Sequence, residues 1–180
     1  MRAALLTRLP LPGAARTAVS AVLLEVFAGT FGVEAPRVFG MGPDRALYAF
    51  REFSAACMDE ALSSPVYAAR KREELEGRAR ALGEAVRRVL RPGDGELAGL
   101  VSYFYAAIGI DVVAHVPGAL TFKRCHFAGG YTPALCAFMS AFDSGFVGGL
   151  AGGGSLRFEE RITEGAPCCV AVFSDREEAE

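Results

Sequence analysis

The spacing of apolar residues changes from a helical to an alternating pattern near residue 110, and this change constrains the fold more than any other feature. Before it, apolar residues recur at three- and four-residue steps, as on one face of an α-helix. After it come short runs that alternate or are rich in β-branched residues. We therefore predict an α+β fold, with a helical part over residues 1–109, a sheet and one helix over residues 110–173, and a frayed tail over residues 174–180.

Four helices are predicted in the first part, with limits set by capping residues, prolines and glycines. They cover residues 14–30, 44–61, 64–91 and 94–109. Arginine and glutamate are interleaved along the third helix, which indicates a solvated surface more than an anion-binding face.

The second part is predicted to contain two strand pairs. Pro117-Gly118 is a turn-forming pair between the runs 111–116 and 120–124, which predicts a β-hairpin. A helix follows over residues 132–148, and two further strands are predicted over residues 156–162 and 170–173. We therefore expect a small antiparallel sheet, built from two hairpin-like strand pairs with an intervening helix and packed by the helical N-terminal half.

Length and composition narrow the class of protein. With 180 residues, 52% of them hydrophobic, the chain can bury one core, so we predict a single domain over residues 1–180. The net charge of −2 argues against nucleic acid, because phosphate binding needs a concentrated positive surface. Charged residues and prolines interrupt the apolar runs, so neither a secretion signal nor a membrane span is predicted. Five cysteines without the spacing of a disulfide framework favour a reducing, cytoplasmic setting.

Cys125 is the first candidate for chemistry. It follows Lys123 and Arg124 at the end of the hairpin and precedes His126. Neighbouring cations lower the pKa of a thiol, so the sequence predicts an activated Cys125. Adjacent residues of a strand point to opposite faces, so His126 becomes its base only if the following turn rotates one side chain. A half-buried thiol at a strand end is an equally good interpretation.

Asp143 is the second candidate. On the helix over residues 132–148 it shares a polar stripe with Cys136 and Ser140, which lie seven and three positions before it. A carboxylate there is either a boundary residue in water or the partner of a histidine, a backbone N–H or a substrate nitrogen. The residues alone favour the boundary interpretation for Asp143, and small packing roles for Cys136 and Ser140.

A metal site is the minority alternative. Cys168 and Cys169 begin the last strand, where alternation sends one side chain inward and the other outward. Cys125, His126 and Cys169 are ligand types that suit zinc, but they lack the characteristic spacing of a zinc motif. We therefore predict no metal ligands, with zinc as the alternative cofactor.

The order of these features over residues 110–173 resembles the L-2-amino-thiazoline-4-carboxylic acid hydrolase family. The matching residues are Arg124-Cys125, Asp143, Arg161-Ile162-Thr163, Glu164-Gly165 and Cys169. Val170 and Ala171 stand where members of that family usually carry an acidic residue and an aromatic. The ending Gly-x-x-x-Cys after a strand is also similar to the 4-vinyl reductase domains, which are small-molecule-binding modules.

The first resemblance implies a hydrolase that opens a small cyclic amidine-like ring by adding water to the carbon between nitrogen and sulfur. Cys125 would attack that carbon or hold a metal that activates water. Asp143 would contact a ring nitrogen, and His126 would move the proton. Lys123 or Arg124 would bind the substrate carboxylate, and Cys169 belongs to the same substrate-binding set.

Two alternatives stay beside the hydrolase. The second resemblance implies a binding or regulatory module without catalysis, and the third option is an interaction protein, such as a homodimer, that has lost catalysis. A small cavity where Cys125, Asp143 and a cation converge would favour the hydrolase. A long apolar tunnel with those residues apart would favour the binding module.

Overall fold

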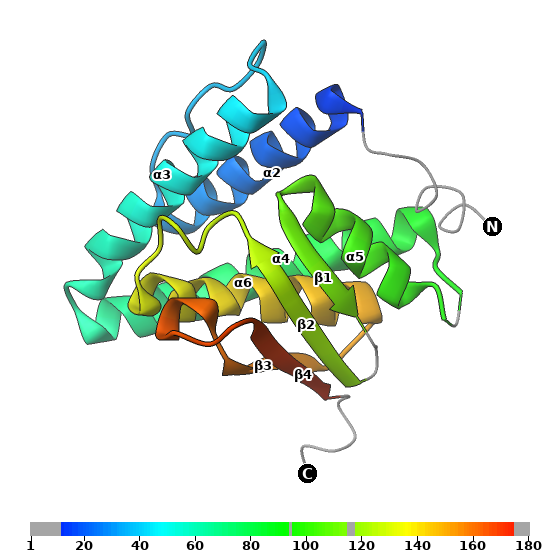
Figure 1. The fold of residues 1–180 in the computed structure, drawn as a ribbon. Coiled ribbons are helices and arrows are strands. Elements are labelled where there is room, and N and C mark those ends of the chain that lie inside the picture. Colours follow the sequence, from blue (N-terminus) through cyan, green and yellow to red (C-terminus); the bar gives the residue numbers. More distant parts are fainter. Residues whose placement is uncertain (1–11, 94, 115–117, 175–180) are drawn as a thin grey trace.

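The helices and strands begin and end where prolines, capping residues and glycines place them (Figure 1). The computed structural model describes residues 12–93, 95–114 and 118–174, so the predicted turn at Pro117 and all but the first residue of the predicted tail lie outside the described residues. The helices are α2 (Gly13–Phe31), α3 (Pro43–Leu62), α4 (Pro65–Leu90), α5 (Leu97–Ala107) and α6 (Pro133–Ala151). The strands are β1 (Ile110–Ala114), β2 (Gly118–Cys125), β3 (Ser155–Glu160) and β4 (Cys169–Ser174). The α+β prediction is confirmed.

Local capping explains the helix limits. Ser64 accepts a hydrogen bond from the Tyr67 backbone N–H at 3.5 Å, and Thr132 accepts one from Leu135 at 3.3 Å. Both caps are followed by proline at the first helical position, which suits proline because it has no N–H to satisfy. The strand predicted over residues 156–162 ends earlier, at Glu160. A short 3-10 helix, η1 (Ile162–Glu164), turns the chain back toward β4 instead.

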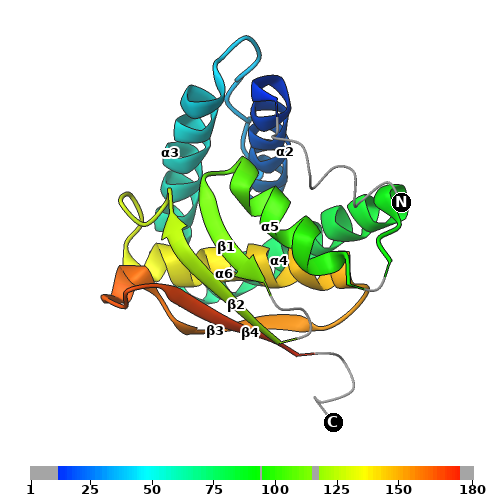
Figure 2. The same cartoon turned by 45° about the vertical axis from the view of Figure 1, so that its right-hand side comes forward.

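The four strands form one antiparallel sheet in the order β1-β2-β4-β3, and Figure 2 shows it beside α6. Alternation sends Leu120 and Phe122 of β2 into the core, together with Cys169, Ala171 and Phe173 of β4. The pairing of β1 with β2 is irregular, because Asp111 pairs with Arg124 whereas Val112 pairs with Phe122. Lys123 is thus an extra residue on β2, and this irregularity is named the β2 bulge below.

Helices α4 and α6 lie side by side and approach each other unusually closely (Figures 1 and 2). Glycines make the approach feasible. A Cβ atom added to Gly145 would lie 2.2 Å from the Glu76 carbonyl oxygen, and one added to Gly149 would lie 2.2 Å from the Arg80 carbonyl oxygen. No real Cβ atom tolerates such a distance, so these positions admit only hydrogen. The contact fixes α6, which carries Asp143.

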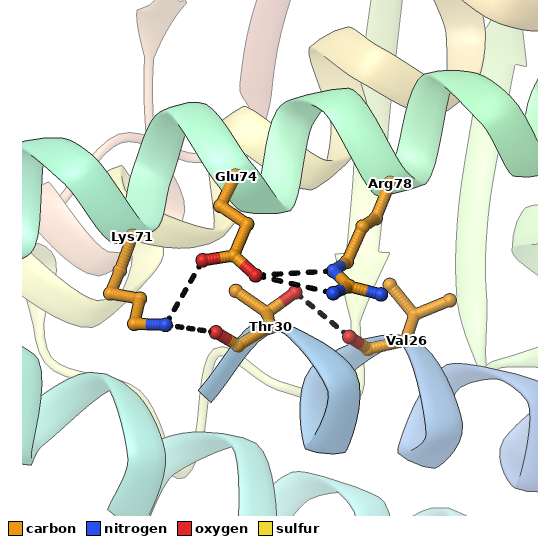
Figure 3. Close-up of polar contacts among 5 residues, drawn as sticks. All are labelled: Val26, Thr30, Lys71, Glu74 and Arg78. Atoms are coloured by element: carbon orange, nitrogen blue, oxygen red, sulfur yellow. Dashed lines mark hydrogen bonds and ion pairs between the residues drawn. The ribbon is translucent and has the colours of Figure 1, made fainter. Parts of the chain in front are cut away.

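The C-terminal end of α2 is held against α4 by a polar cluster (Figure 3). The Lys71 ammonium donates to the Thr30 carbonyl oxygen, one of the carbonyls that a helix end leaves without an intrahelical partner. Glu74 accepts from Lys71 at 3.0 Å and from Arg78 at 3.3 Å, so it links both cations. The cluster positions α2, whose Leu23 side chain lines a cavity between the sheet, α5 and α6.

Among the described residues, two helices, α2 and α6, are long and apolar enough to cross a membrane by length and composition. Core helices of soluble proteins and signal sequences meet the same criterion, and α6 is mostly buried within the protein. The sequence-based predictions of no membrane segment and of a cytoplasmic location stay predictions.

Candidate functional site

A small cavity of about 60 Å³ lies between the sheet, α5 and α6, and is named the inner cavity. Three thiols line it, from Cys125 at the end of β2, Cys136 on α6 and Cys169 at the start of β4. Asp143 and Ser140 of α6 line it as well. The predicted site residues Cys125, Asp143 and Cys169 therefore share one cavity, although they come from three elements.

Asp143 is half-buried and lines the inner cavity. The Tyr105 hydroxyl, from α5, donates a hydrogen bond to Asp143 Oδ1 at 2.7 Å. Burial raises the pKa of the carboxyl to about 6, although the Tyr105 hydrogen bond and the positive charge of Arg161 oppose the rise. Asp143 can therefore gain and lose a proton near neutral pH, as a general acid or base requires.

Arg161 supplies the cation of the site. It follows β3, and its Nη2 donates to Ser140 Oγ at 3.3 Å. The guanidinium lies 5.3 Å from the centre of the Phe158 ring and pairs with Glu164 at 3.5 Å. Its charge opposes the rise in pKa of Asp143, Cys136 and Cys169. Its Nε is buried and has no hydrogen-bond partner among the described residues.

Lys123 and Arg124 do not reach the inner cavity. The β2 bulge breaks the alternation of the strand, so both side chains are exposed while Phe122 and Cys125 face inward. Arg124 pairs with Asp111 on the surface, at 3.7 Å. Both cations line a separate, open groove, named the outer groove. They are therefore placed to bind an anion there, and not beside Asp143.

The predicted lowering of the Cys125 pKa is wrong. Burial raises the pKa of this thiol to about 11, although the backbone N–H groups of Phe127 and Ala128 favour the thiolate. The bulge explains the difference, because it turns Lys123 and Arg124 away from the sulfur. Cys125 is thus a neutral thiol at pH 7 and needs a proton acceptor before it can attack a substrate.

His126 lines the outer groove and is not among the residues that line the inner cavity. Burial, followed by the positive charge of Arg51, lowers its pKa, so the imidazole is neutral at pH 7. Its Nε2 atom is buried without a hydrogen-bond partner among the described residues. Cys125 lines both spaces, so His126 stands beside it on the outer side while Asp143 stands on the inner side.

Two further cysteines complete the wall. Cys169 Sγ accepts a hydrogen bond from the Ile162 backbone N–H at 3.3 Å, which ties η1 to β4. Burial raises the pKa of Cys136, and the neighbouring Thr163 hydroxyl opposes that rise. Within residues 12–93, 95–114 and 118–174, no three His, Cys, Asp or Glu side chains form a group that could hold a metal ion. The zinc alternative therefore gains no ligand set from this part of the chain.

Three residues at the inner cavity are not among the predicted site residues: Tyr105 and Tyr131 line it, and Arg161 contacts its wall. Arg161 stands within the motif Arg161-Ile162-Thr163, and that motif was the signal that could have identified it. Tyr105 lies on an apolar helix, where an aromatic residue normally indicates core packing. Tyr131 also lines the cavity, with its hydroxyl 2.6 Å from Ser54 Oγ, and no pattern in the sequence distinguishes it.

No known protein family, curated protein or solved structure matches this chain. The resemblance over residues 110–173 to thiazoline-carboxylate hydrolases and to 4-vinyl reductase domains therefore stays a prediction.

Proposed function

We propose that the protein is a hydrolase that opens a small cyclic compound at a carbon bonded to nitrogen, as the resemblance to L-2-amino-thiazoline-4-carboxylic acid hydrolases implies. Two observations support this proposal: Cys125 and Asp143 line one small cavity, and a cation, Arg161, donates a hydrogen bond to Ser140 in its wall. A nucleophile, a proton carrier and an anion-binding group are the parts that such a reaction requires.

Charge complementarity defines the substrate. The carboxylate of Asp143 favours a protonated ring nitrogen, and the Tyr105 hydrogen bond holds the carboxylate in place. Arg161 has an unpartnered donor and favours a substrate carboxylate. A cyclic amidine with a carboxylate substituent carries both groups, as 2-amino-thiazoline-4-carboxylate does.

Proton transfer sets the order of steps. Asp143 carries the proton of the Cys125 thiol to the ring nitrogen, which creates a thiolate and an electrophilic carbon together. The thiolate adds to the carbon between nitrogen and sulfur, and the ring carbon–sulfur bond breaks, so the substrate sulfur leaves as a thiolate. Water then adds to the same carbon and displaces Cys125. Its oxygen becomes a carbonyl oxygen and its two protons go to Cys125 and to the released sulfur, so one water is consumed for each ring opened. In this mechanism Asp143 takes the proton-moving role first predicted for His126.

The experiment is to incubate the purified protein with 2-amino-thiazoline-4-carboxylate and follow the gain of one water by mass spectrometry, with release of thiol as a second readout. Rapid acid quenching should trap an adduct, and peptide mapping should place it on Cys125. Cys57→Ala is the matched control, because Cys57 is buried in α3 and does not line the inner cavity. Absence of both ring opening and adduct from folded protein would contradict the proposal.

Arg161→Gln should raise KM for 2-amino-thiazoline-4-carboxylate by roughly 10- to 100-fold, because a hydrogen bond to a charged group contributes about 1.5–3 kcal/mol. The same variant should leave KM for 2-amino-thiazoline, which lacks the carboxylate, nearly unchanged. Arg157→Gln is the control, since Arg157 lies on β3 and pairs with Glu159 on the surface. Equal losses with both compounds would mean that Arg161 does not bind the carboxylate.

A small-molecule-binding module, as the resemblance to 4-vinyl reductase domains implies, is the second candidate. It is favoured by an apolar cavity of about 240 Å³ that adjoins the inner cavity. Tight binding of a ring compound without any ring opening would select this function.

A further inference from the structure

The inner cavity is too small to enclose a whole substituted ring. Its volume is about 60 Å³, whereas a cavity that holds benzene has about 150 Å³. The reacting carbon and its nitrogen fit beside Cys125 and Asp143, but the remainder of a larger substrate must extend elsewhere. The direction of that extension decides which substrates the site accepts.

A second cavity offers the space. The apolar cavity of about 240 Å³ lies among α2, α4, α5 and α6, and its wall is almost entirely apolar. Val19 and Val22 of α2, Val86 of α4 and Phe104 of α5 are among its lining residues. Val22 is 44% exposed, so the cavity wall reaches the protein surface there. A space of this kind excludes charged groups and favours hydrocarbon.

The two cavities share part of one wall. Leu23, Tyr105, Ile108 and Phe142 line both of them. Tyr105 is fixed by its hydrogen bond to Asp143, and Phe142 stacks on Phe146 with ring centres 6.0 Å apart. Leu23 and Ile108 are aliphatic and can change rotamer without loss of a hydrogen bond. They are the side chains that a substrate would displace to extend from one cavity into the other.

We propose that the natural substrate carries an apolar substituent, of the size of a phenyl group or a short alkyl chain, which occupies the apolar cavity while the reacting carbon and nitrogen of the ring lie in the inner cavity. This inference rests on the proposed function for the identity of the ring. It assigns the hydrocarbon part of the substrate to α2, α4 and α5, elements outside the 110–173 segment that carries the family resemblance.

The test uses derivatives of 2-amino-thiazoline-4-carboxylate with a methyl, propyl or pentyl group on the ring carbon next to sulfur, and isothermal calorimetry to measure Kd. Each buried methylene should lower Kd about fourfold, so pentyl, with four more methylenes, should bind roughly 200-fold more tightly than methyl. Val86→Trp should fill the apolar cavity and remove this gradient, while Kd for the unsubstituted compound stays within about twofold. Val89→Trp is the matched control, because Val89 lies on the same helix, is 66% exposed and does not line the cavity.

Three results would overturn the inference. They are the absence of a gradient in the wild-type protein, the absence of any binding, and a gradient that survives in Val86→Trp. A changed oligomeric state of Val86→Trp in size-exclusion chromatography, with the gradient intact, would assign the apolar face to a second copy of the chain. Turnover is measured separately. A chain-length gradient without ring opening refutes the hydrolase but keeps the apolar subsite. Ring opening without a gradient keeps the hydrolase but refutes the apolar subsite.

Discussion

Gly149→Ala should destabilise the protein by about 3 kcal/mol, in the upper range for overpacking of a core. The added Cβ would lie 2.2 Å from the Arg80 carbonyl oxygen and 3.0 Å from the Glu84 backbone nitrogen. These are backbone atoms of α4, so no rotamer change relieves the clash and the two helices must separate. Separation would also move Asp143 and the cavity that it lines.

Urea unfolding followed by circular dichroism measures this loss, and Gly77→Ala is its control. Gly77 is an exposed residue within α4 with nothing within 4 Å of its added Cβ. Alanine there should stabilise the protein by about 1 kcal/mol, because glycine is a poor helix former. Replacing glycine by alanine should thus lower the free energy of unfolding at position 149 and raise it at position 77. A Gly149→Ala protein as stable as the wild type would show that α4 and α6 are not in such close contact.

Asp143→Asn should reduce kcat by at least roughly 1,000-fold, within the range expected for loss of a general acid–base group. The amide keeps an oxygen that can accept the Tyr105 hydrogen bond, so the cavity should keep its shape. It cannot, however, carry a proton from Cys125 to a ring nitrogen. The measurement is single-turnover ring opening at pH 7, with Asp111→Asn as control because Asp111 lies on the surface of β1. Activity within tenfold of the wild type would exclude Asp143 as the proton carrier.

The pH dependence of stability gives an independent test of the same residue. The folded-state pKa of Asp143 is about 6, above the ordinary value of 3.8, so the folded protein holds this proton more tightly than the unfolded chain. The free energy of unfolding that Asp143 contributes is therefore highest below pH 4 and falls as pH rises through 6, by about 3 kcal/mol in total. Asp143→Asn should remove this slope and match or exceed the wild type in stability at pH 7. An unchanged slope between pH 4 and 6 would contradict a raised pKa.

The fold was largely predictable because local signals set its elements. Pro65 and Pro133 mark helix starts, and Gly152 ends α6 in a left-handed conformation. Spacing alone also placed Asp143 beside Ser140 on one stripe of α6. The spacing of residues does not show where this stripe lies in the folded protein. The close contact of the α6 glycines with α4 fixes its position. The same limit applies to Tyr105, whose hydroxyl matters only because α5 crosses α6 near Asp143.

The cations of the site were predicted less well. The chain order Lys123-Arg124-Cys125 suggested that positive charge and thiol lie together, an inference that assumes a regular strand. The strand is irregular at this point, so proximity in sequence is not proximity in space. Arg161 is far along the chain from Cys125, and only the antiparallel pairing of β4 with β2 and β3 brings its segment to the cavity.

The β2 bulge has a consequence for how related chains should be compared. Compared with a regular strand of the same length, each residue after Lys123 faces the opposite side of the sheet. A relative with the same residues but a regular strand at this point would present its thiol to water and its arginine to the interior. Two chains could then agree at every position of the motif and differ in whether they possess a reactive centre. The presence of the bulge before the cysteine is therefore a better criterion of shared chemistry than the motif itself.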